Sequence, residues 1–386
     1  MSLVTPRKGY KKEKLKNLCK FSSGEFLPNT QQQKGNIPVF GGNGINGFHN
    51  KSITKNPTII IGRVGAYCGS IHISKEQCWI TDNAIFINSL NEEINIDFLF
   101  RYLLKININR LAETAAQPKI SQSILRNIVI LYPDVKEQQK IATILSNVDN
   151  LIESTEKVIT HSKKVKKGLM QKLLTRGIGH TKFKKVPWLF GKEIEIPDEW
   201  EVKTISELGK IVTGSTPDTT NKKYFGNDFL WASPIDFEGE KYITQTNSML
   251  SEKGLSISRK IPKDAVLVVC IGSTIGKIGM ASVEMSTNQQ INSIICNNVD
   301  SNFIYYQLQQ NNYLIKNRSN QSAVPIINKT EFGKFKLILP NEIQKQQKIA
   351  TILSNIDSKI TSQEQYKEKL QKLKKSLMQK LLTGEV

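Results

Sequence analysis

One helical segment occurs twice in this chain. Residues 138–175 read QQKIATILSNVDNLIESTEKVITHSKKVKKGLMQKLLT, and residues 346–383 read QQKIATILSNIDSKITSQEQYKEKLQKLKKSLMQKLLT. The copies match at a constant offset of 208 residues without a gap, and 24 of their 38 positions are identical. The globular stretch before each copy is much less similar to its counterpart. Such a duplication predicts two equivalent halves, with long helices that separate two globular domains like a ruler.

Apolar residues recur at three- and four-residue steps through both copies, over 141–173 and 349–381. This period is typical of the seam of a left-handed coiled coil. Thirty-eight helical residues would span roughly 57 Å. Three polar residues, Thr155, Ser162 and Gln363, fall in the seam, where they would set the register at some cost in stability.

We expect the two helices to pair with each other, because helices of matched length can lie antiparallel with one globular domain at each end. The alternative is pairing with another chain, as in a dimerisation coiled coil. That alternative explains the apolar seam, but it does not explain why the ends, QQK and LMQKLLT, are repeated so closely. The repeated ends therefore predict two equivalent docking sites for a partner that binds twice.

The order along the chain is globular, helix, linker, globular, helix. Both globular stretches contain short β-type runs broken by Gly, Asn and Pro, such as TIIIGRV and AVLVVCIG, followed by a helical run. We expect the α+β class: two similar globular domains and two long helices that form an antiparallel, pseudo-two-fold symmetric coiled coil. The expected bounds are 1–133 for the first domain, 134–175 for the first helix, 176–199 for a linker, 200–340 for the second domain and 341–386 for the second helix.

Faint similarity between the globular stretches supports the duplication. AAQPKISQSILRNIVILYP at 115–133 aligns with SAVPIINKTEFGKFKLILP at 322–340 at an offset of 207 residues. The alignment matches Pro118 with Pro325, Ile120 with Ile327 and Pro133 with Pro340. Two readers of different sequences, built on one framework, would show this pattern of a retained scaffold and diverged surface residues.

The formal net charge is +20 and the sequence pI is about 9.6. A surface this positive attracts polyanions, and nucleic acid is our first interpretation. An anionic membrane surface is the alternative, but no apolar run approaches the ~20 residues of a spanning helix. The N-terminal stretch is basic without an apolar core region, so we expect a cytoplasmic protein without a signal peptide.

No catalytic motif is recognisable. GSTIGKIG at 272–279 is one residue short of a P-loop, and Ile278 stands where the magnesium-binding hydroxyl should be. Nucleophile-elbow, HExxH and Asn-Pro-Pro-Tyr motifs are all missing, as is a nuclease carboxylate–lysine cluster. The five cysteines form no CxxC pair and the four histidines are scattered, so no metal site is expected. We therefore expect a chain without catalytic residues or a cofactor of its own.

Basic residues crowd the helices. From Lys157 to Lys185 there are ten Lys or Arg and no Asp or Glu. These lysines would form a solvated face, or a stripe that contacts DNA phosphates between two half-sites without reading sequence, or a surface for an acidic partner. The candidates are Lys163, Lys164, Lys166, Lys167, Lys372, Lys374 and Lys375.

Base reading requires paired donors and acceptors on well-held loops: Arg for guanine, Asn or Gln for adenine. Both globular stretches offer such residues, although an AT-rich coding bias would also enrich Asn and Gln. The candidates in the first are Gln31, Asn43, Asn46, His49, Arg63, Gln117 and Lys119. In the second they are Ser215, Thr216, Asn227, Lys253, Lys277, Gln289, Arg318 and Gln321.

Several motifs together resemble one known family. They are the doubled QQKIATILSN and LMQKLLT, IPDEW at 196–200, SEKGL at 251–255 and IGSTIGKIG at 271–279. With these motifs the chain resembles, over essentially its whole length, the DNA-specificity subunit of a Type I restriction-modification enzyme. Base-contacting residues cannot be transferred, because the recognition domains vary most within that family.

The resemblance implies that two target-recognition domains each read half of a bipartite site in double-stranded DNA. The helices would set the gap between the halves and dock two modification (methyltransferase) subunits, which recruit restriction subunits. The assembly would methylate adenine with S-adenosylmethionine and cleave DNA with ATP and Mg²⁺. Those cofactors would belong to the partners, and this subunit would itself be non-catalytic.

One departure from the family pattern concerns the start of the first domain. KGYKKEKLKNLCKF lacks the Pro-Asp-Glu that precedes Trp200, so we expect this lead-in to be less well anchored. Two other functions stay open: a specificity subunit of a Type IIB-like enzyme, and a stand-alone coiled-coil regulator that binds DNA as a homodimer. A stand-alone nuclease or methyltransferase is opposed by the missing motifs.

Overall fold

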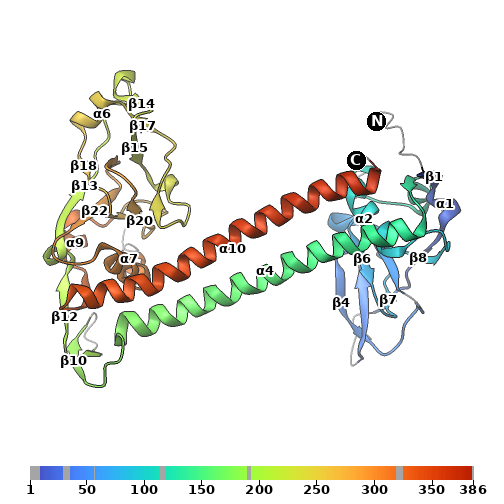
Figure 1. Ribbon diagram of the computed structural model, residues 1–386, viewed down its shortest axis with the longest axis horizontal. Helices are drawn as coiled ribbons and strands as arrows, with labels where there is room; N and C mark the ends of the chain where they lie inside the picture. Colours follow the sequence, from blue (N-terminus) through green and yellow to red (C-terminus); the bar gives the residue numbers. More distant parts are fainter. Residues whose placement is uncertain are drawn as a thin grey trace. The chain divides into compact units, whose positions relative to one another are not determined.

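The computed structural model describes residues 9–28, 35–55, 57–113, 118–188, 193–318 and 325–384, apart from the side chain of Arg318. The chain divides into two compact units. Unit 1 comprises Met1–Val158 and Gln363–Val386, and unit 2 comprises Ile159–Ser362. Two long helices, α4 (Val135–Arg176) and α10 (Ile343–Thr383), each contribute one end to either unit (Figure 1). We call the rest of unit 1 the first domain and the rest of unit 2 the second domain.

In the described part of the first domain the strands form three small sheets, with orders β2-β8-β5-β6, β4-β3-β7 and β1-β9. Helix α2 packs against β5 and β6, and Asn95 caps its start by accepting a hydrogen bond from the Phe98 amide. The strands are β1 (Lys11–Lys14), β2 (Cys19–Ser23), β3 (Ile37–Gly41), β4 (Gly44–His49), β5 (Thr58–Gly62), β6 (Ile71–Ser74), β7 (Trp79–Ile80), β8 (Ala84–Leu90) and β9 (Val129–Tyr132). The helices are α1 (Leu15–Leu18), α2 (Ile96–Ile106) and α3 (Gln122–Arg126), with short 3-10 turns η2 (Gly65–Tyr67) and η3 (Ile108–Leu111).

The second domain repeats this plan with additions. Its main sheet has the order β13-β22-β19-β20-β16, so the first four strands match β2-β8-β5-β6, and α7 packs against β19 and β20 as α2 does in the first domain. The other sheets are β14-β17-β15-β21-β18, β12-β23 and β10-β11. The early strands are β10 (Phe183–Pro187), β11 (Glu193–Pro197), β12 (Trp200–Thr204), β13 (Gly209–Thr213), β14 (Phe225–Gly226), β15 (Phe229–Ala232) and β16 (Tyr242–Ile243). The later strands are β17 (Met249–Leu250), β18 (Lys260–Ile261), β19 (Val266–Val269), β20 (Ile278–Ala281), β21 (Met285–Thr287), β22 (Ile291–Cys296) and β23 (Lys336–Pro340). The helices are α5 (Ile205–Leu208), α6 (Glu252–Ile257), α7 (Ser301–Gln310), α8 (Asn312–Arg318) and α9 (Lys329–Gly333), with 3-10 turns η5 (Lys222–Tyr224) and η6 (Pro234–Asp236).

The expected α+β class is confirmed, and so is pairing of the long helices within the chain. In unit 1, Lys374 Nζ lies 2.6 Å from Asp149 Oδ1, and Lys367 pairs with Glu156. In unit 2, Lys166 Nζ lies 2.5 Å from Asp357 Oδ1. The two residue numbers add to 523 in every pair, which is the mark of an antiparallel register. Two of the polar seam residues, Thr155 and Ser162, are buried as predicted.

The repeated ends of the helices have a role inside the chain. Gln138 is fully buried; its Nε2 donates to the carbonyl of Pro133 and its Oε1 accepts from the Asn95 amide, both at 2.8 Å. Gln346 makes the same two kinds of bond, to Pro340 at 2.8 Å and Asp300 at 2.9 Å. The prediction that the matched ends serve a partner was therefore wrong for these glutamines, because they bind each helix to its own preceding domain.

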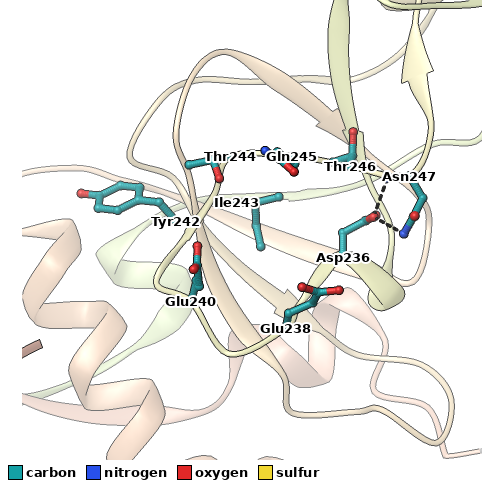
Figure 2. Close-up of a pocket in the computed structure, with 9 residues that line it drawn as sticks. All are labelled: Asp236, Glu238, Glu240, Tyr242, Ile243, Thr244, Gln245, Thr246 and Asn247. Atoms are coloured by element: carbon teal, nitrogen blue, oxygen red, sulfur yellow. Dashed lines mark hydrogen bonds between the residues drawn. The ribbon is translucent and has the colours of Figure 1, made fainter. Parts of the chain in front are cut away.

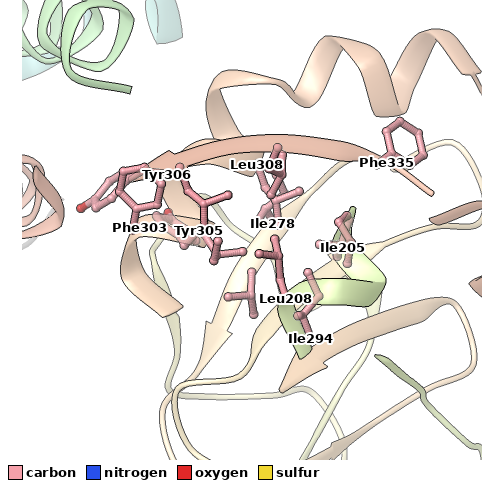
Figure 3. Packing of buried hydrophobic residues seen from close by; sticks show 14 of the residues in the cluster. Ile205, Leu208, Ile278, Ile294, Phe303, Tyr305, Tyr306, Leu308 and Phe335 are labelled. Atoms are coloured by element: carbon pink, nitrogen blue, oxygen red, sulfur yellow. The ribbon is translucent and has the colours of Figure 1, made fainter. Parts of the chain in front are cut away.

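The LMQKLLT ends are also used internally. Leu174, near the end of α4, is fully buried in the core of unit 2, and Leu382, near the end of α10, is fully buried in the core of unit 1. The unit 2 core is built around Trp200, whose ring meets that of Phe303 edge-on with centroids 6.2 Å apart. Figure 3 shows Phe303 among other apolar side chains of this cluster. Each domain is thus held by the long helix that follows it in sequence and by the C-terminal end of the other long helix.

We expect Leu174→Ala to lower the free energy of unfolding of unit 2 by about 2–5 kcal/mol, because it leaves a cavity in a closed core. Urea unfolding of the full chain, followed by tryptophan fluorescence, measures this change. Val165→Ala on the same helix is the control, since that side chain is 40% exposed and should cost less than about 1 kcal/mol. Equal effects of the two substitutions would show that the end of α4 is not anchored in this core.

The lead-in to the first domain is anchored better than expected. Strand β1 pairs with β9 as β12 pairs with β23, and Leu15 is as fully buried as its counterpart Ile205. Only Tyr10 differs: it is half-buried and donates from its hydroxyl to the Leu381 carbonyl at 3.1 Å, whereas Trp200 is fully buried. The lead-in is therefore anchored by strand pairing in both domains, with or without Pro-Asp-Glu. In unit 2, the segment 176–199 carries the hairpin β10–β11.

Within the described part of the chain, no helix combines the length and apolar character that crossing a membrane requires.

Candidate nucleic-acid interface

Polar loops gather at one edge of the main sheet in each domain. In the first domain the pairs Ser23↔Ile85 and Gly62↔Ala84 bring the ends of β2 and β5 beside the start of β8. The second domain has the same arrangement, since β13 and β19 both end beside the start of β22. We call the loops at these positions the edge loops. Loops far apart in sequence therefore meet at equivalent places in the two domains.

Backbone hydrogen bonds hold the edge loops of the first domain. The Arg63 amide donates to Asn83 at 2.9 Å, and the Arg63 carbonyl accepts from the Ile120 amide at 2.9 Å. Lys119, next to Ile120, forms an isolated bridge with Val64. These contacts place Arg63 and Lys119, two of the candidate residues, on neighbouring backbone segments.

The turn between β3 and β4, which carries Asn43, joins the same group. The Ser70 hydroxyl donates to the Gly42 carbonyl, and a Cβ on Gly42 would lie 3.5 Å from the Cα of Gly62. Asn43 thus lies on a turn that packs against the loop after β5. Three candidates of the first domain, Asn43, Arg63 and Lys119, come together at the sheet edge.

The prolines matched in the sequence accept equivalent backbone hydrogen bonds in the two domains. The Gly65 amide donates to Pro118 at 3.1 Å, and the Gly272 amide donates to Pro325 at 2.9 Å. The Ile327 amide then donates to Cys270 at 2.8 Å, as Ile120 does to Arg63. The alignment made from sequence therefore matches residues in equivalent positions.

In the second domain the edge loops bring Ser215, Thr216 and Gln289 together. The Thr216 hydroxyl bonds to Gln289 Oε1, and the Ser215 amide donates to the Thr287 carbonyl at 2.8 Å. Thr216 and Gln289 are both exposed. Because Gln289 Oε1 accepts from Thr216, its amide nitrogen stays available as a donor, and such a donor can read an acceptor on a base edge.

Glycines permit the close packing of these loops. A Cβ on Gly24 would collide with the carbonyl oxygen of Thr81, and a Cβ on Gly214 would collide with those of Asn288 and Thr287. The two glycines directly follow β2 and β13, so they occupy the same place in the two domains. A larger residue at either position would displace the turn that precedes β8 or β22.

The other candidates lie elsewhere. Asn46 and His49 lie on β4 of the smaller sheet, where the His49 ring packs edge-on against Trp79 with centroids 5.2 Å apart. Asn227 follows β14, and Lys253 lies in α6. Lys277 Nζ donates to the Pro234 carbonyl at 3.3 Å and lines a cavity beside Met170 of α4. Gln31, Gln117, Gln321 and the side chain of Arg318 lie outside the described residues.

The helix lysines divide into two groups. Lys166 and Lys374 are ion-paired with aspartates of the opposite helix at 2.5 and 2.6 Å, and they hold the helices together. Lys372 pairs with Glu368 of its own helix at 2.6 Å on the surface. The remaining candidates are exposed; they are Lys163, Lys164, Lys167 and Lys375.

Two residues at the edge loops were not predicted. Arg259 is exposed; its Nη1 donates to the Thr213 carbonyl at 2.8 Å and its amide donates to Ser215 Oγ at 3.1 Å. Tyr67, 52% exposed, lies on the loop after β5. An Arg fork and an exposed aromatic ring are suited to bases and phosphates, but neither residue lies in a recognisable motif.

An acidic cavity of about 440 Å³ lies in the second domain, lined by Asp236, Glu238 and Glu240 (Figure 2). Asp236 accepts hydrogen bonds from the amide and side chain of Asn247 at 2.7 and 2.9 Å, so it stabilises the segment 236–247 that lines the cavity. Among the described residues, no group of three or more His, Cys, Asp or Glu is placed to hold a metal ion. A cavity with three carboxylates would repel DNA, so we do not include it in the candidate nucleic-acid interface.

Residues 7–161 and 197–372 match the protein family described as Type I restriction modification DNA specificity domain. The chain is similar to the putative type I restriction enzyme MjaX specificity subunit of Methanocaldococcus jannaschii, with 32% identity over 75% of this chain and 64% of that protein. It is 29% identical to the MjaVIII specificity subunit of the same organism, over 87% and 81% of the two chains. With the HindI specificity subunit of Haemophilus influenzae it shares 34% identity over 50% of this chain and 42% of the relative.

The match to MjaX and HindI spans less than two thirds of those relatives. Among solved structures, the S subunit of a Type I restriction-modification system from M. genitalium superposes with a TM-score of 0.69 at 18% identity. That comparison covers 99% of this chain and 98% of the other. At this identity the likeness shows a shared fold.

Proposed function

This chain belongs to the family of Type I restriction-modification DNA specificity subunits, and we propose that it reads a bipartite target in double-stranded DNA, one half with each domain. The observation that carries this proposal is the pair of equivalent edge-loop assemblies. Both are held by equivalent backbone hydrogen bonds to the carbonyls of Pro118 and Pro325, yet the side chains that the two assemblies expose differ.

The differences between the two assemblies favour two different half-sites. Arg63 and Lys119 of the first domain correspond to Cys270 and Ile326 of the second. The second domain instead offers Thr216, Gln289 and an exposed Arg259. A guanidinium favours guanine, whereas an amide favours adenine. A common scaffold with distinct side chains thus supports recognition of an asymmetric, two-part sequence.

We propose that the long helices set the gap between the half-sites. Ion pairs with a single antiparallel register occur in both units, so neither helix can slide without breaking them. Exposed lysines such as Lys164 and Lys167 would lie near DNA and add phosphate contacts that carry no sequence information.

Residues that are identical in the two helix copies and exposed in both support a partner that binds twice. The buried matched residues have internal roles, but several exposed residues near the start of each helix also agree in both copies, and none of them takes part in the cores of the two units. We propose that these residues dock two modification subunits, which supply adenine methylation, the S-adenosylmethionine site and the link to ATP- and Mg²⁺-dependent cleavage, while this chain is non-catalytic. The exposed identical pairs near the start of each helix are Gln139 and Gln347, Lys140 and Lys348, Thr143 and Thr351, and Asn147 and Asn355.

Mapping of modified adenines in host DNA, with and without this gene, tests the proposal. Loss of one split motif with two defined halves and a constant gap is the expected result. Unchanged adenine modification, with the modification subunits present, would contradict the proposal and favour a stand-alone regulator.

The docking proposal predicts a stoichiometry. Asn147→Arg alone and Asn355→Arg alone are each expected to weaken one of two modification-subunit contacts by at least about tenfold, because a bulky charge enters a closed interface. The double variant should lose both. Native mass spectrometry of the reconstituted complex distinguishes two, one or no bound subunits. Loss of both subunits in a single variant would mean that the sites are not independent.

A further inference from the structure

Asp149 and Asp357 occupy matching positions in the two long helices, 208 residues apart. In unit 1, Asp149 Oδ2 accepts from Arg101 Nη1 at 2.6 Å, and Asp149 Oδ1 lies 2.6 Å from Lys374 Nζ. Arg101 belongs to α2 of the first domain, and Lys374 belongs to α10. One carboxylate is therefore bonded to a recognition domain on one side and to the opposite helix on the other. We call Arg101, Asp149 and Lys374 the first joint.

The second joint consists of Tyr306, Asp357 and Lys166. Asp357 Oδ2 accepts from the Tyr306 hydroxyl at 2.6 Å, and Oδ1 lies 2.5 Å from Lys166 Nζ. Lys166 is the sequence match of Lys374. Tyr306 and Arg101 each stand six residues after the residue that caps their helix, α7 or α2. Unrelated side chains thus reach the same carboxylate position in the two units.

A matched serine completes each joint. Arg101 Nη2 donates to Ser146 Oγ at 2.8 Å, and the Tyr306 hydroxyl lies 3.1 Å from Ser354 Oγ. The second joint also recruits Lys241 of the second domain, whose Nζ donates to Ser354 Oγ at 3.0 Å and lies 4.8 Å from the Tyr306 ring centroid. Lys241 thereby supplies the domain-side cation that Tyr306 lacks.

The charges of the joints are tightly held. Arg101 is only 7% exposed, so loss of its partner would leave a desolvated guanidinium uncompensated. Burial acts to raise the pKa of Asp149, but hydrogen bonds from Lys374 and Arg101 outweigh it and lower that pKa. Burial lowers the pKa of Lys241, and the nearby Asp357 carboxylate offsets part of this effect. Both joints are therefore costly to break.

Each domain has a second polar anchor on its own helix, the buried Gln138 or Gln346. Asp149 follows Gln138 by eleven residues, which is about 16 Å along a helix. Apolar packing is non-directional, so two directional anchors at this separation determine the angle of the domain. With one anchor removed, the domain could pivot about the other.

We propose that Asp149 and Asp357, with their domain-side partners Arg101 and Tyr306, are positioning residues that set the angle of each recognition domain on the helices and thereby the number of base pairs allowed between the half-sites. The proposal rests on the proposed reading of a bipartite target. One additional base pair moves the second half-site by about 3.4 Å and turns it by about one tenth of a turn. A domain free to pivot would tolerate such a change.

The test uses the reconstituted methyltransferase complex on synthetic duplexes with the natural gap and with gaps one base pair shorter or longer. Arg101→Gln is expected to lower the preference for the natural gap by about tenfold, and Tyr306→Phe should act in the same direction. Selectivity within each half-site should stay unchanged, a separation that mere loss of folded protein cannot produce. Glu156→Gln is the control, because it breaks a helix–helix ion pair without touching a recognition domain.

An unchanged gap preference in Arg101→Gln and Tyr306→Phe, with both half-sites still read, would overturn the proposal. If Arg101→Gln does not fold, Tyr306→Phe still decides, since it keeps the ring and removes only the hydroxyl. A wild-type complex that shows no gap preference would instead contradict the proposed function itself.

Discussion

Replacing the second domain with that of another specificity subunit is expected to change one half of the recognised DNA sequence and to leave the other half as it was. The edge loops of the first domain lie wholly in unit 1, and the backbone hydrogen bonds that hold them join residues of that unit. Each mismatched base pair costs about 1–3 kcal/mol. Two changed base pairs would therefore lower binding to the original target by about thirtyfold or more.

The graft must keep the residues that attach a domain to the helices. Its α7 should present a hydroxyl or a cation to Asp357, and its core must accept Leu174 from α4. The new motif is read by mapping modified adenines, and the reciprocal exchange of the first domain should alter the other half. A motif in which both halves change would show that the domains do not read independently.

The fold was largely predictable from the sequence because its strongest signals are long. Thirty-eight residues repeated at one offset, with a regular apolar seam, predict two paired helices, and two of the seam's polar residues, Thr155 and Ser162, are buried as expected. The prediction that Gln138 serves a partner was wrong because a polar residue near a helix start normally faces water, whereas this one is buried. Its burial depends on Pro133 and on Asn95, whose amide approaches from 43 residues away.

The candidate site was less predictable, because its contacts depend on topology. Pro118 and Pro325 could be matched from sequence, since the scaffold repeats. Arg259 could not be found, because its amide meets Ser215 only after the strands between them have folded. Lys374 was predicted as an outward-facing charge because its partner, Asp149, lies 225 positions away in the other helix.

Lengthening both helices by one heptad is expected to lengthen the gap in the target while both half-sites keep their sequences. The insertions belong between Lys157 and Val158 and between Gln365 and Tyr366, since these positions face each other in the register of the ion pairs. Seven residues add about 10 Å of helix, or about three base pairs at 3.4 Å each. A whole heptad also continues the apolar seam.

The helical twist of DNA limits how well the lengthened protein can methylate its new target. Three base pairs also turn the duplex by about a third of a turn, so the lengthened protein should methylate its new target more slowly than the natural protein methylates the natural one. Insertion of five residues in each helix is the matched control, because it turns the apolar face by about 140° away from the seam and should abolish methylation at any gap. A heptad variant that read different half-sites would contradict the ruler mechanism, because edge loops that keep their own backbone contacts should read the same bases whatever separates them.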